Sequence, residues 1–494
     1  MKFRLILIGF LFTGLMGNAQ TQATVTNNKV QTYINEMIKD PMFTNAGISF
    51  YVKNLATGGI VAEHNKNLAL SPASVMKLVS TSTAMQKLGT GYRFKTQLYI
   101  HGSLDSNGVL NGDLYIKGGG DPTLGSKYYN KKGHKGDFLK KWADTIKAFG
   151  IKKINGRIIG DASIFGKQGA PGGWSWSDMG NYYGAAPSGL NIYDNILELQ
   201  FKTGANHGDS TELTCTYPYI EGLEIKNYVT SSRIKKDNSY AYSAPFSNDF
   251  FVTGTLPLAK DSFLVKGAIQ NPALICALEL ESELEKLGIQ ISSHATTFRE
   301  LKNRPDSMYK SQEFKLVYSN KSPSLLSISK LTNQRSVNLF AESLLSATGV
   351  RTYGSGSTYN GSMAVNKYWS GKITTLGMSV TDGSGLSRSN GISAKHLTDL
   401  LAYMAKTKNA AKFKSTLAVA GKSGTLSSVC RRQAAAGKIK AKSGSMTRVK
   451  SYSGYVDCSS GKKLAFTIIV NNFRGKSYQV KKKLEGLFNA MATY

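Results

Sequence analysis

The chain has 494 residues, of which 41% are hydrophobic and 10% aromatic. This composition excludes a disordered polar chain, and the length predicts two or three domains. With 62 basic and 31 acidic residues, the net charge is +31, and a field of that sign attracts polyanions. Four cysteines are too few for a disulfide scaffold, and their spacing leaves three pairings, or free thiols, open.

The first twenty residues have the parts of a secretory signal peptide. Lys2 and Arg4 precede an apolar run over residues 5–16, and small and polar residues follow. The run is shorter than the roughly 20 apolar residues that span a bilayer. We therefore expect residues 1–19 to be a signal peptide and the mature chain to be exported to the periplasm, soluble or peripherally bound to an anionic envelope surface. An exported chain meets no genomic DNA, so acidic envelope polymers and carboxylate-bearing peptides are the expected partners, and nucleic acid is not.

Residues 44–66 alternate apolar and polar positions around Ala-Thr-Gly-Gly, which predicts a β-hairpin. A loop containing Pro72 then leads into a predicted buried helix that begins near Ser74. From about residue 92 to residue 312, short β-like runs alternate with turns rich in Gly, Asn and Asp, so this region is predicted to be largely β.

After residue 314 the pattern becomes helical again, with a break near residues 334–335 and a further helix that Ser393 caps. The last part predicts strands followed by a terminal helix. We expect one discontinuous α/β catalytic domain and an inserted β-rich region of two subdomains. The expected boundaries are 25–92 and 313–494 for the catalytic domain, 93–312 for the insertion, and within it about 93–165 with 260–312 and about 166–259.

Ser74 and Lys77 are the first candidates for chemistry. A serine at a helix N-terminus lies beside free backbone N–H groups, and a lysine at i+3 lies on the same face one turn along. If burial lowers the pKa of the amine, it can take the serine proton as a general base. Other Ser-x-x-Lys spacings occur by chance in this lysine-rich chain, and an ordinary capping serine is the structural alternative. Only the pair at Ser74 follows a hairpin and a Pro-containing loop into an apolar helix.

Two more segments carry polar groups that can reach a cleft. Ser336 and Asn338 lie at the break between helical patterns, where a loop can aim a hydroxyl and an amide. Of two Lys-Ser-Gly runs, the one at Lys442 follows an alternating pattern typical of a strand, whereas the run at Lys422 follows a helix without alternation. Lys442 is therefore the candidate, and Lys422 is interpreted as part of a loop.

Ser-x-x-Lys, Ser-x-Asn and Lys-[Ser/Thr]-Gly in this order resemble the signature of penicillin-recognising serine enzymes. Further stretches are similar to the D-alanyl-D-alanine carboxypeptidase/endopeptidase family of the penicillin-binding protein 4 type, and the resemblance extends over most of the mature chain. They are GDLYIKGGGDPTL (112–124), WSWSDMGNYYGAAPSGLN (174–191), SVNLFAESLL (336–345), TDGSGLSRSNGIS (381–393), GTLSS (424–428) and AAGKIKAKSGSM (435–446). In that family the GTL segment precedes the true third motif, which again favours Lys442.

The resemblance implies a fold class: an α/β (α+β) penicillin-binding/serine β-lactamase-like transpeptidase domain, with an antiparallel sheet flanked by helices and β-rich inserted domains. It also implies a serine-type D-Ala-D-Ala carboxypeptidase, and a D,D-endopeptidase, acting on peptidoglycan stem peptides. Val337 stands where Asp or Asn is usual, and Ser443 where Thr is usual. Because the groups that do chemistry are kept, we expect altered rates rather than lost function.

The resemblance assigns roles to the three motifs. Ser74 would attack the carbonyl of the penultimate D-Ala with Lys77 as base, and Ser336 would pass a proton to the leaving amine, with help from Lys442. Asn338 would orient Lys77 and hold a peptide amide of the substrate.

The third motif would hold the substrate. Lys442 and the hydroxyls of Ser443 and Ser445 would bind its terminal carboxylate, and Gly444 would let its backbone approach closely. The backbone N–H groups of Ser74 and Ser445 would form the oxyanion hole. β-Lactam antibiotics would acylate Ser74 as covalent inhibitors, and no cofactor or metal is implied.

Two other functions stay open at this point. A serine β-lactamase would share the nucleophile and base but needs a group that activates water for deacylation, and Glu342, near the middle motif, is interpreted as structural. A non-catalytic binder of acidic cell-envelope polymers would use the +31 charge alone. The six histidines have no spacing typical of a metal site and are interpreted as structural.

Overall fold

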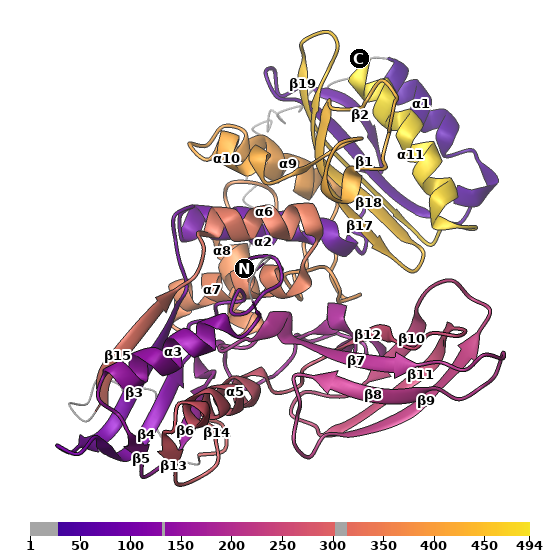
Figure 1. The fold of residues 1–494 in the computed structure, drawn as a ribbon. Coiled ribbons are helices and arrows are strands. Elements are labelled where there is room, and N and C mark those ends of the chain that lie inside the picture. Colours follow the sequence, from indigo (N-terminus) through magenta and orange to yellow (C-terminus); the bar gives the residue numbers. More distant parts are fainter. Residues whose placement is uncertain (1–27, 131–133, 302–313) are drawn as a thin grey trace, which may run out of the picture.

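The computed structural model describes residues 28–130, 134–301 and 314–494, so the predicted signal peptide lies outside the described residues (Figure 1). All four cysteines are free, and only Cys215 is exposed. Within the described ranges, no helix combines the length and apolarity needed to cross a bilayer.

A six-stranded antiparallel sheet joins the two ends of the chain, in the order β16-β17-β18-β19-β1-β2. The predicted N-terminal hairpin is present as β1 and β2, and β1 pairs with β19 over its whole length. The strand bounds are β1 (Gly47–Asn54), β2 (Ile60–His64), β16 (Ala418–Val419), β17 (Ile439–Met446), β18 (Val449–Asp457) and β19 (Lys463–Asn471).

Helices cover both faces of this sheet because its strands bury side chains alternately to either side. On β19, Phe466 and Ile468 pack against the terminal helices α1 (Lys29–Met37) and α11 (Ser477–Ala492). Ala465 and Ile469 point the other way, into a helical core. That core is built from α2 (Lys77–Lys87), α6 (Leu325–Arg335), α7 (Asn338–Tyr353), α8 (Thr358–Trp369), α9 (Ala394–Met404) and α10 (Ala410–Ser415).

Helix α2 lies at the centre of the molecule, and its residues from Lys77 to Met85 are all buried. Its polar side chains are satisfied inside the protein. The Ser80 hydroxyl donates to the Gly383 carbonyl at 2.7 Å, and the Trp369 indole donates to Thr83 Oγ1 at 2.8 Å. A helix surrounded in this way excludes water from any group on it, including the amine of Lys77.

The region between β2 and α6 contains the remaining sheets and confirms the prediction of extra β-rich structure. One sheet contains β3 (Lys95–Leu104), β4 (Val109–Lys117), β5 (Lys153–Ile154), β6 (Ile158–Asp161), β13 (Gln290–Ile291), β14 (Thr296–Thr297) and β15 (Phe314–Lys321). Two three-stranded sheets contain β7 (Ile196–Lys202), β8 (Glu212–Tyr217) and β12 (Phe263–Ala268), and β9 (Glu224–Ser232), β10 (Asn238–Tyr242) and β11 (Asp249–Pro257).

The same region contains two helices that the sequence analysis did not anticipate, α3 (Asp137–Ala148) and α5 (Pro272–Lys286). The Gly- and aromatic-rich tract 166–191 is mostly loop and holds the short helix α4 (Trp176–Met179). Short 3₁₀ turns are η1 (Pro41–Phe43), η2 (Ala73–Met76), η3 (Ser163–Phe165), η4 (Tyr182–Gly184), η5 (Tyr193–Asn195) and η7 (Gly424–Leu426). The division into a discontinuous catalytic domain and two inserted subdomains stays a prediction.

Phe340 of α7 ties the inserted region to the helical core. It is fully buried, and its ring centroid lies 5.8 Å from that of Tyr128 and 6.3 Å from that of Tyr129. We predict that Phe340→Ala lowers the free energy of unfolding by about 3–5 kcal/mol, the range for deleting a buried aromatic ring. Denaturant titration checks this, with Tyr359→Ala, an exposed tyrosine, as the control that changes stability by less than about 0.5 kcal/mol. Equal stability of the two variants would contradict the packing described.

Candidate active site

Ser74 lies where the chain enters the central helix. The first turn is the 3₁₀ turn η2, and α2 follows it directly. Because a 3₁₀ helix has three residues per turn, side chains at i and i+3 eclipse, which brings Ser74 and Lys77 closer than an α-helical turn would. Lys77 Nζ lies 2.8 Å from Ser74 Oγ. The predicted pairing of these two side chains is therefore present, with a tighter turn than expected.

Lys77 is fully buried and has three oxygen partners. Besides Ser74 Oγ, its amine lies 2.6 Å from Asn338 Oδ1 and 2.7 Å from the Ser384 carbonyl. The last two oxygens only accept, so a neutral amine satisfies them with its two N–H groups and turns its lone pair to the serine hydroxyl. Burial lowers the pKa of Lys77 to about 7, although the charges of Asp382 and Glu342 act in the opposite direction. The amine can thus accept a proton near neutral pH.

Ser336 and Asn338 lie at the predicted break between helices. Ser336 ends α6 in the left-handed region, with φ of 61°, and Asn338 is the first residue of α7. This turn aims both side chains at the central helix and β17. Asn338 Oδ1 accepts from Lys77, and its Nδ2 donates to the Tyr183 carbonyl at 2.7 Å. A carboxamide nitrogen has two N–H groups, so one is left for another acceptor.

Lys442 lies on β17, as the strand pattern predicted, and its side chain is fully buried. Its amine donates to Ser336 Oγ at 2.9 Å and to the Ser443 carbonyl at 2.6 Å. Burial, and then the charge of Lys77, lower the pKa of Lys442 well below its usual value. Within the described residues no carboxylate forms an ion pair with Lys442, and the hydrogen-bond partners of its amine are uncharged oxygens.

The edge of β17 beyond Ala441 is open, since β16 pairs only with Lys440 and Ala441. The Ile439 carbonyl accepts from Ala420 on this side. Because backbone groups of alternate residues point to the same edge, Ser443 and Ser445 direct their N–H and C=O groups at the open side. A peptide backbone can pair there.

Gly444 lies against the nucleophile turn. A Cβ at this position would lie 2.2 Å from Ser451 Oγ, 2.8 Å from the Pro72 carbonyl and 2.9 Å from the Ser74 nitrogen. The absence of a side chain thus lets β17 approach the backbone of Ser74 closely, which places the N–H of Ser74 near that of Ser445.

A cleft of about 470 Å³ opens over these groups. Ser74, Ser336, Asn338 and Ser445 line it, and the lining does not include Lys77, Lys442, Ser443 or Gly444. The Ser443 hydroxyl donates to Thr425 Oγ1 at 2.8 Å. The rest of the lining includes Lys127, Tyr128, Asp178, Tyr182, Tyr183, Asp194, Arg335, Arg388 and Thr447. Lys422 is not part of the lining, although Thr425, three residues further on, supports the third motif.

The sequence analysis missed Asp382, a fully buried carboxylate below the cleft. It accepts hydrogen bonds from the backbone of Gly385 at 2.8 Å and Ser387 at 2.6 Å, and from the side chains of Asn390 at 2.7 Å and Trp174 at 2.8 Å. These contacts fix the loop that brings the Ser384 carbonyl to Lys77. The stretch 381–393 carried the family resemblance, so the signal was in the sequence without a role attached to it.

Glu342 has the structural role expected of it. Its two carboxylate oxygens accept from the backbone N–H groups of Gly383 at 2.8 Å and Ser384 at 2.7 Å. Burial, and then the charge of Asp382, raise its pKa to about 8. Both carboxylate oxygens are thus engaged by the backbone of this loop, and among the described residues no hydrogen bond joins Glu342 to Ser74.

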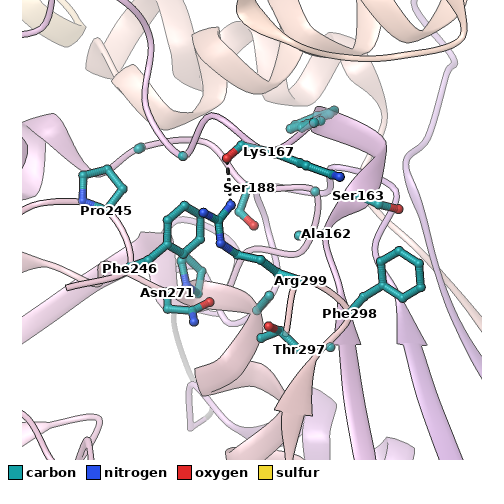
Figure 2. Close-up of a pocket in the computed structure, with 18 of the residues that line it drawn as sticks. Ala162, Ser163, Lys167, Ser188, Pro245, Phe246, Asn271, Thr297, Phe298 and Arg299 are labelled. Carbon is teal, nitrogen blue, oxygen red and sulfur yellow. Dashed lines mark hydrogen bonds between the residues drawn. The ribbon is translucent and has the colours of Figure 1, made fainter. Parts of the chain in front are cut away.

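A larger cavity of about 840 Å³ lies elsewhere, between β6, β14 and the start of α5. Figure 2 shows Arg299 over the ring of Phe246, 3.9 Å from its centroid, with a hydrogen bond of 2.8 Å to the Lys167 carbonyl. None of the sequence-predicted site residues lines this cavity. The smaller cleft, which is lined by the serine that contacts the buried amine of Lys77, is therefore the candidate active site.

A serine hydroxyl beside a buried amine, below an open strand edge, defines the site of a serine hydrolase that uses lysine in place of histidine. The model of the D-Ala-D-Ala carboxypeptidase 3 (S13) family matches residues 30–491. The chain therefore belongs to this family, which confirms the prediction of a serine-type D-Ala-D-Ala carboxypeptidase.

Similar proteins and solved structures agree with this family membership. The chain is 28% identical to a D-alanyl-D-alanine carboxypeptidase of Actinomadura sp. over 462 residues, 90% of this chain and 81% of the relative. It is 26% identical to D-alanyl-D-alanine carboxypeptidase DacB of Haemophilus influenzae over 442 residues, 89% and 88% of the two chains. The crystal structure of penicillin binding protein 4 (dacB) from H. influenzae superposes with a TM-score of 0.79 at 24% identity, covering 93% of this chain and 99% of that one. A structure of that protein complexed with a β-lactam gives 0.74 at 23% identity, with the same coverage. The predicted fold class is confirmed.

We predict that Gly444→Ala slows acylation of Ser74 by a penicillin by about 100-fold or more. The new methyl group must displace β17 from the nucleophile turn, and a shift of about 1 Å in a reacting geometry costs that much. Stopped-flow acylation measures it. The control is Gly91→Ala, where an added Cβ meets nothing within 4 Å. Acylation of Gly444→Ala at the wild-type rate would show that the close approach is not needed.

Proposed function

We propose that Ser74 is the nucleophile of this carboxypeptidase and Lys77 its general base. The observation that carries this is the contact of the buried Lys77 amine with Ser74 Oγ, together with its two other partners, the uncharged oxygens of Asn338 and Ser384. Ser74 Oγ would attack the carbonyl of the penultimate D-Ala while its proton passes to Lys77. The N–H groups of Ser74 and Ser445 would stabilise the oxyanion, and water would then hydrolyse the ester.

Departure of the terminal D-Ala requires a proton on its amine. Ser336 Oγ lies between the cleft and Lys442, from which it accepts a hydrogen bond of 2.9 Å. The proposal is that Ser336 relays this proton and that Lys442 supplies charge. The pKa of Lys442 is lowered while no anion faces it, and a docked substrate carboxylate would favour the charged form. The remaining N–H of Asn338 would hold a peptide carbonyl of the substrate.

The proposed substrate is a peptidoglycan stem peptide ending in D-Ala-D-Ala, and the proposed second activity is D,D-endopeptidase cleavage of cross-links. The open edge of β17 supports a peptide that lies along the strand. β-Lactams are proposed as covalent inhibitors, since a structure of the H. influenzae protein contains one. Export to the periplasm remains a proposal that depends on the sequence of residues 1–19, outside the described residues.

Acylation should depend on pH through Lys77. The base must be neutral, and its pKa is lowered from 10.5 to about 7. We predict that the acylation rate rises tenfold per pH unit below about pH 7 and levels off above it, because protonation removes the lone pair. A pH series of stopped-flow acylation rates checks this. An acid limb that continues to rise up to pH 9 or 10 would contradict the assignment of Lys77 as base.

The nucleophile is tested by intact mass after exposure to labelled penicillin. One adduct, mapped to the peptide that contains Ser74 and missing in Ser74→Ala, is the expected result. A folded protein without an adduct would contradict the proposal.

Nitrocefin hydrolysis distinguishes the β-lactamase alternative, because a β-lactamase gives steady turnover whereas a carboxypeptidase gives a stoichiometric burst. If Ser74→Ala kept its full effect on the cell wall while reversal of surface charge abolished it, the protein would be a polyanion binder instead.

A further inference from the structure

The three-stranded sheet β10-β11-β9 has one face in the core and an aromatic face outside. Ala241, Phe250 and Val252 point inward and are buried. The alternate positions point outward. On that outer face Tyr242 lies directly opposite Phe251. The next outward-facing residue of β11 is Thr253, which pairs with Tyr240 on one side and Tyr228 on the other.

The outer rings, with Trp176 of α4, form a continuous surface that we call the aromatic platform. Its members are Trp176, Tyr228, Tyr240, Tyr242 and Phe251. The rings of Tyr242 and Phe251 are stacked, 4.8 Å apart at an angle of 8°, and Trp176 lies 5.0 Å from Tyr242 and 5.6 Å from Phe251. Tyr228 lies 6.4 Å from Phe251.

Much of the platform faces solvent. Trp176 is 54% exposed, Tyr228 61% and Tyr240 48%. Single exposed aromatic residues are normal on a protein surface, but a contiguous aromatic patch marks a binding surface. Leaving so much apolar area in water gives up the free energy that its burial would contribute to folding. The core of this sheet is filled from its other face, so the fold does not require these rings.

The platform continues into the active-site cleft. The four-residue helix α4 carries Trp176 on the platform and Asp178 in the cleft lining. The Tyr183 hydroxyl donates to Asp178 Oδ1 at 3.2 Å, and Tyr183 also lines the cleft. Tyr183 is thus bonded to the same short helix that carries Trp176 of the platform. A molecule that extends from the cleft past Tyr183 therefore meets the platform.

We propose that the aromatic platform binds the polysaccharide strand to which the stem peptide in the cleft is attached. This rests on the proposed function, in which the substrate is a peptide carried by a glycan. Pyranose rings present flat faces of C–H groups, which carry slight positive charge and pack against the negative faces of aromatic rings. Thr253 and Lys226 stand beside the rings in the strand register and supply polar groups for sugar hydroxyl and acetamido oxygens.

A weak saccharide site is sufficient here because the two parts of the substrate are covalently joined. Once the peptide is in the cleft, the glycan is held beside the platform at a high effective concentration, in the millimolar range for a short link. The platform would thus favour polymeric over free peptide substrates and fix the direction in which the strand runs across the inserted sheets.

The test is binding of the full-length mature protein to glycan strands from which the stem peptides have been removed enzymatically. We expect wild type to bind and the double variant Trp176→Ala/Tyr228→Ala to bind about tenfold more weakly, from two lost ring contacts. Tyr228→Phe keeps the ring and should retain binding. The control is Tyr478→Ala, a 57% exposed tyrosine on α11, a helix that packs against the six-stranded sheet.

Acylation by penicillin on the same samples separates the two proposals and identifies a misfolded variant. Wild type that is acylated but does not bind bare glycan, or a double variant that is acylated and binds as wild type does, overturns the inference and leaves the proposed function intact. Absence of acylation in wild type defeats the proposed function itself. A wild type that dimerises in sedimentation, with a monomeric Tyr228→Ala, would assign the platform to a second copy of the chain and also overturn the inference.

Discussion

The burial of the Lys77 amine is the constraint on which the site depends. A lysine in the middle of a helical core is costly when charged, so its pKa falls toward the range in which it can act as a base. That burial requires α2 to be covered on its sides by α6, α7, α8, α9 and the loop at residues 381–390, while β17 and β18 pack against the preceding turn η2. The same enclosure explains why the polar residues of α2 bond to carbonyls and side chains inside the protein and not to water.

Two carboxylates near Lys77 would defeat this arrangement if they paired with it. An ion pair would keep the amine protonated, whereas the partners of Lys77 are three uncharged oxygens. Asp382 and Glu342 are instead saturated by backbone N–H groups of the loop from Gly383 to Ser387. Their hydrogen-bonding capacity stabilises the loop, and the loop presents a neutral carbonyl, that of Ser384, to the base. The acids thus position a partner of Lys77, while their charges raise the pKa of Lys77 against the larger effect of burial.

The local parts of the site could be predicted from sequence, and the long-range parts could not. Ser74 and Lys77 are one turn apart, Ser336 and Asn338 flank one helix boundary, and strand alternation separates Lys442 from Lys422. Each of these inferences needs a few neighbouring residues. The contacts of Asp382 with Trp174 and of Asn338 with Tyr183 join positions more than 150 residues apart, and no periodicity encodes them. Helix α5 was missed for a different reason. Asn271 caps this helix and Pro272 lies in its first turn, but in a region rich in turn residues the same two residues also indicate a turn.

The long-range contacts also explain why the inserted region belongs to the enzyme and is not a separate module. Trp174 donates to the carboxylate that fixes the loop under Lys77, and the Tyr183 carbonyl holds the amide that orients the same amine. Both residues come from the tract between η3 and β7, which also supplies α4 and part of the cleft lining. One short tract therefore contacts two residues that position the base, lines part of the cleft and packs against the outer sheet β10-β11-β9. The insertion therefore contributes to the chemistry as well as to the surface around it.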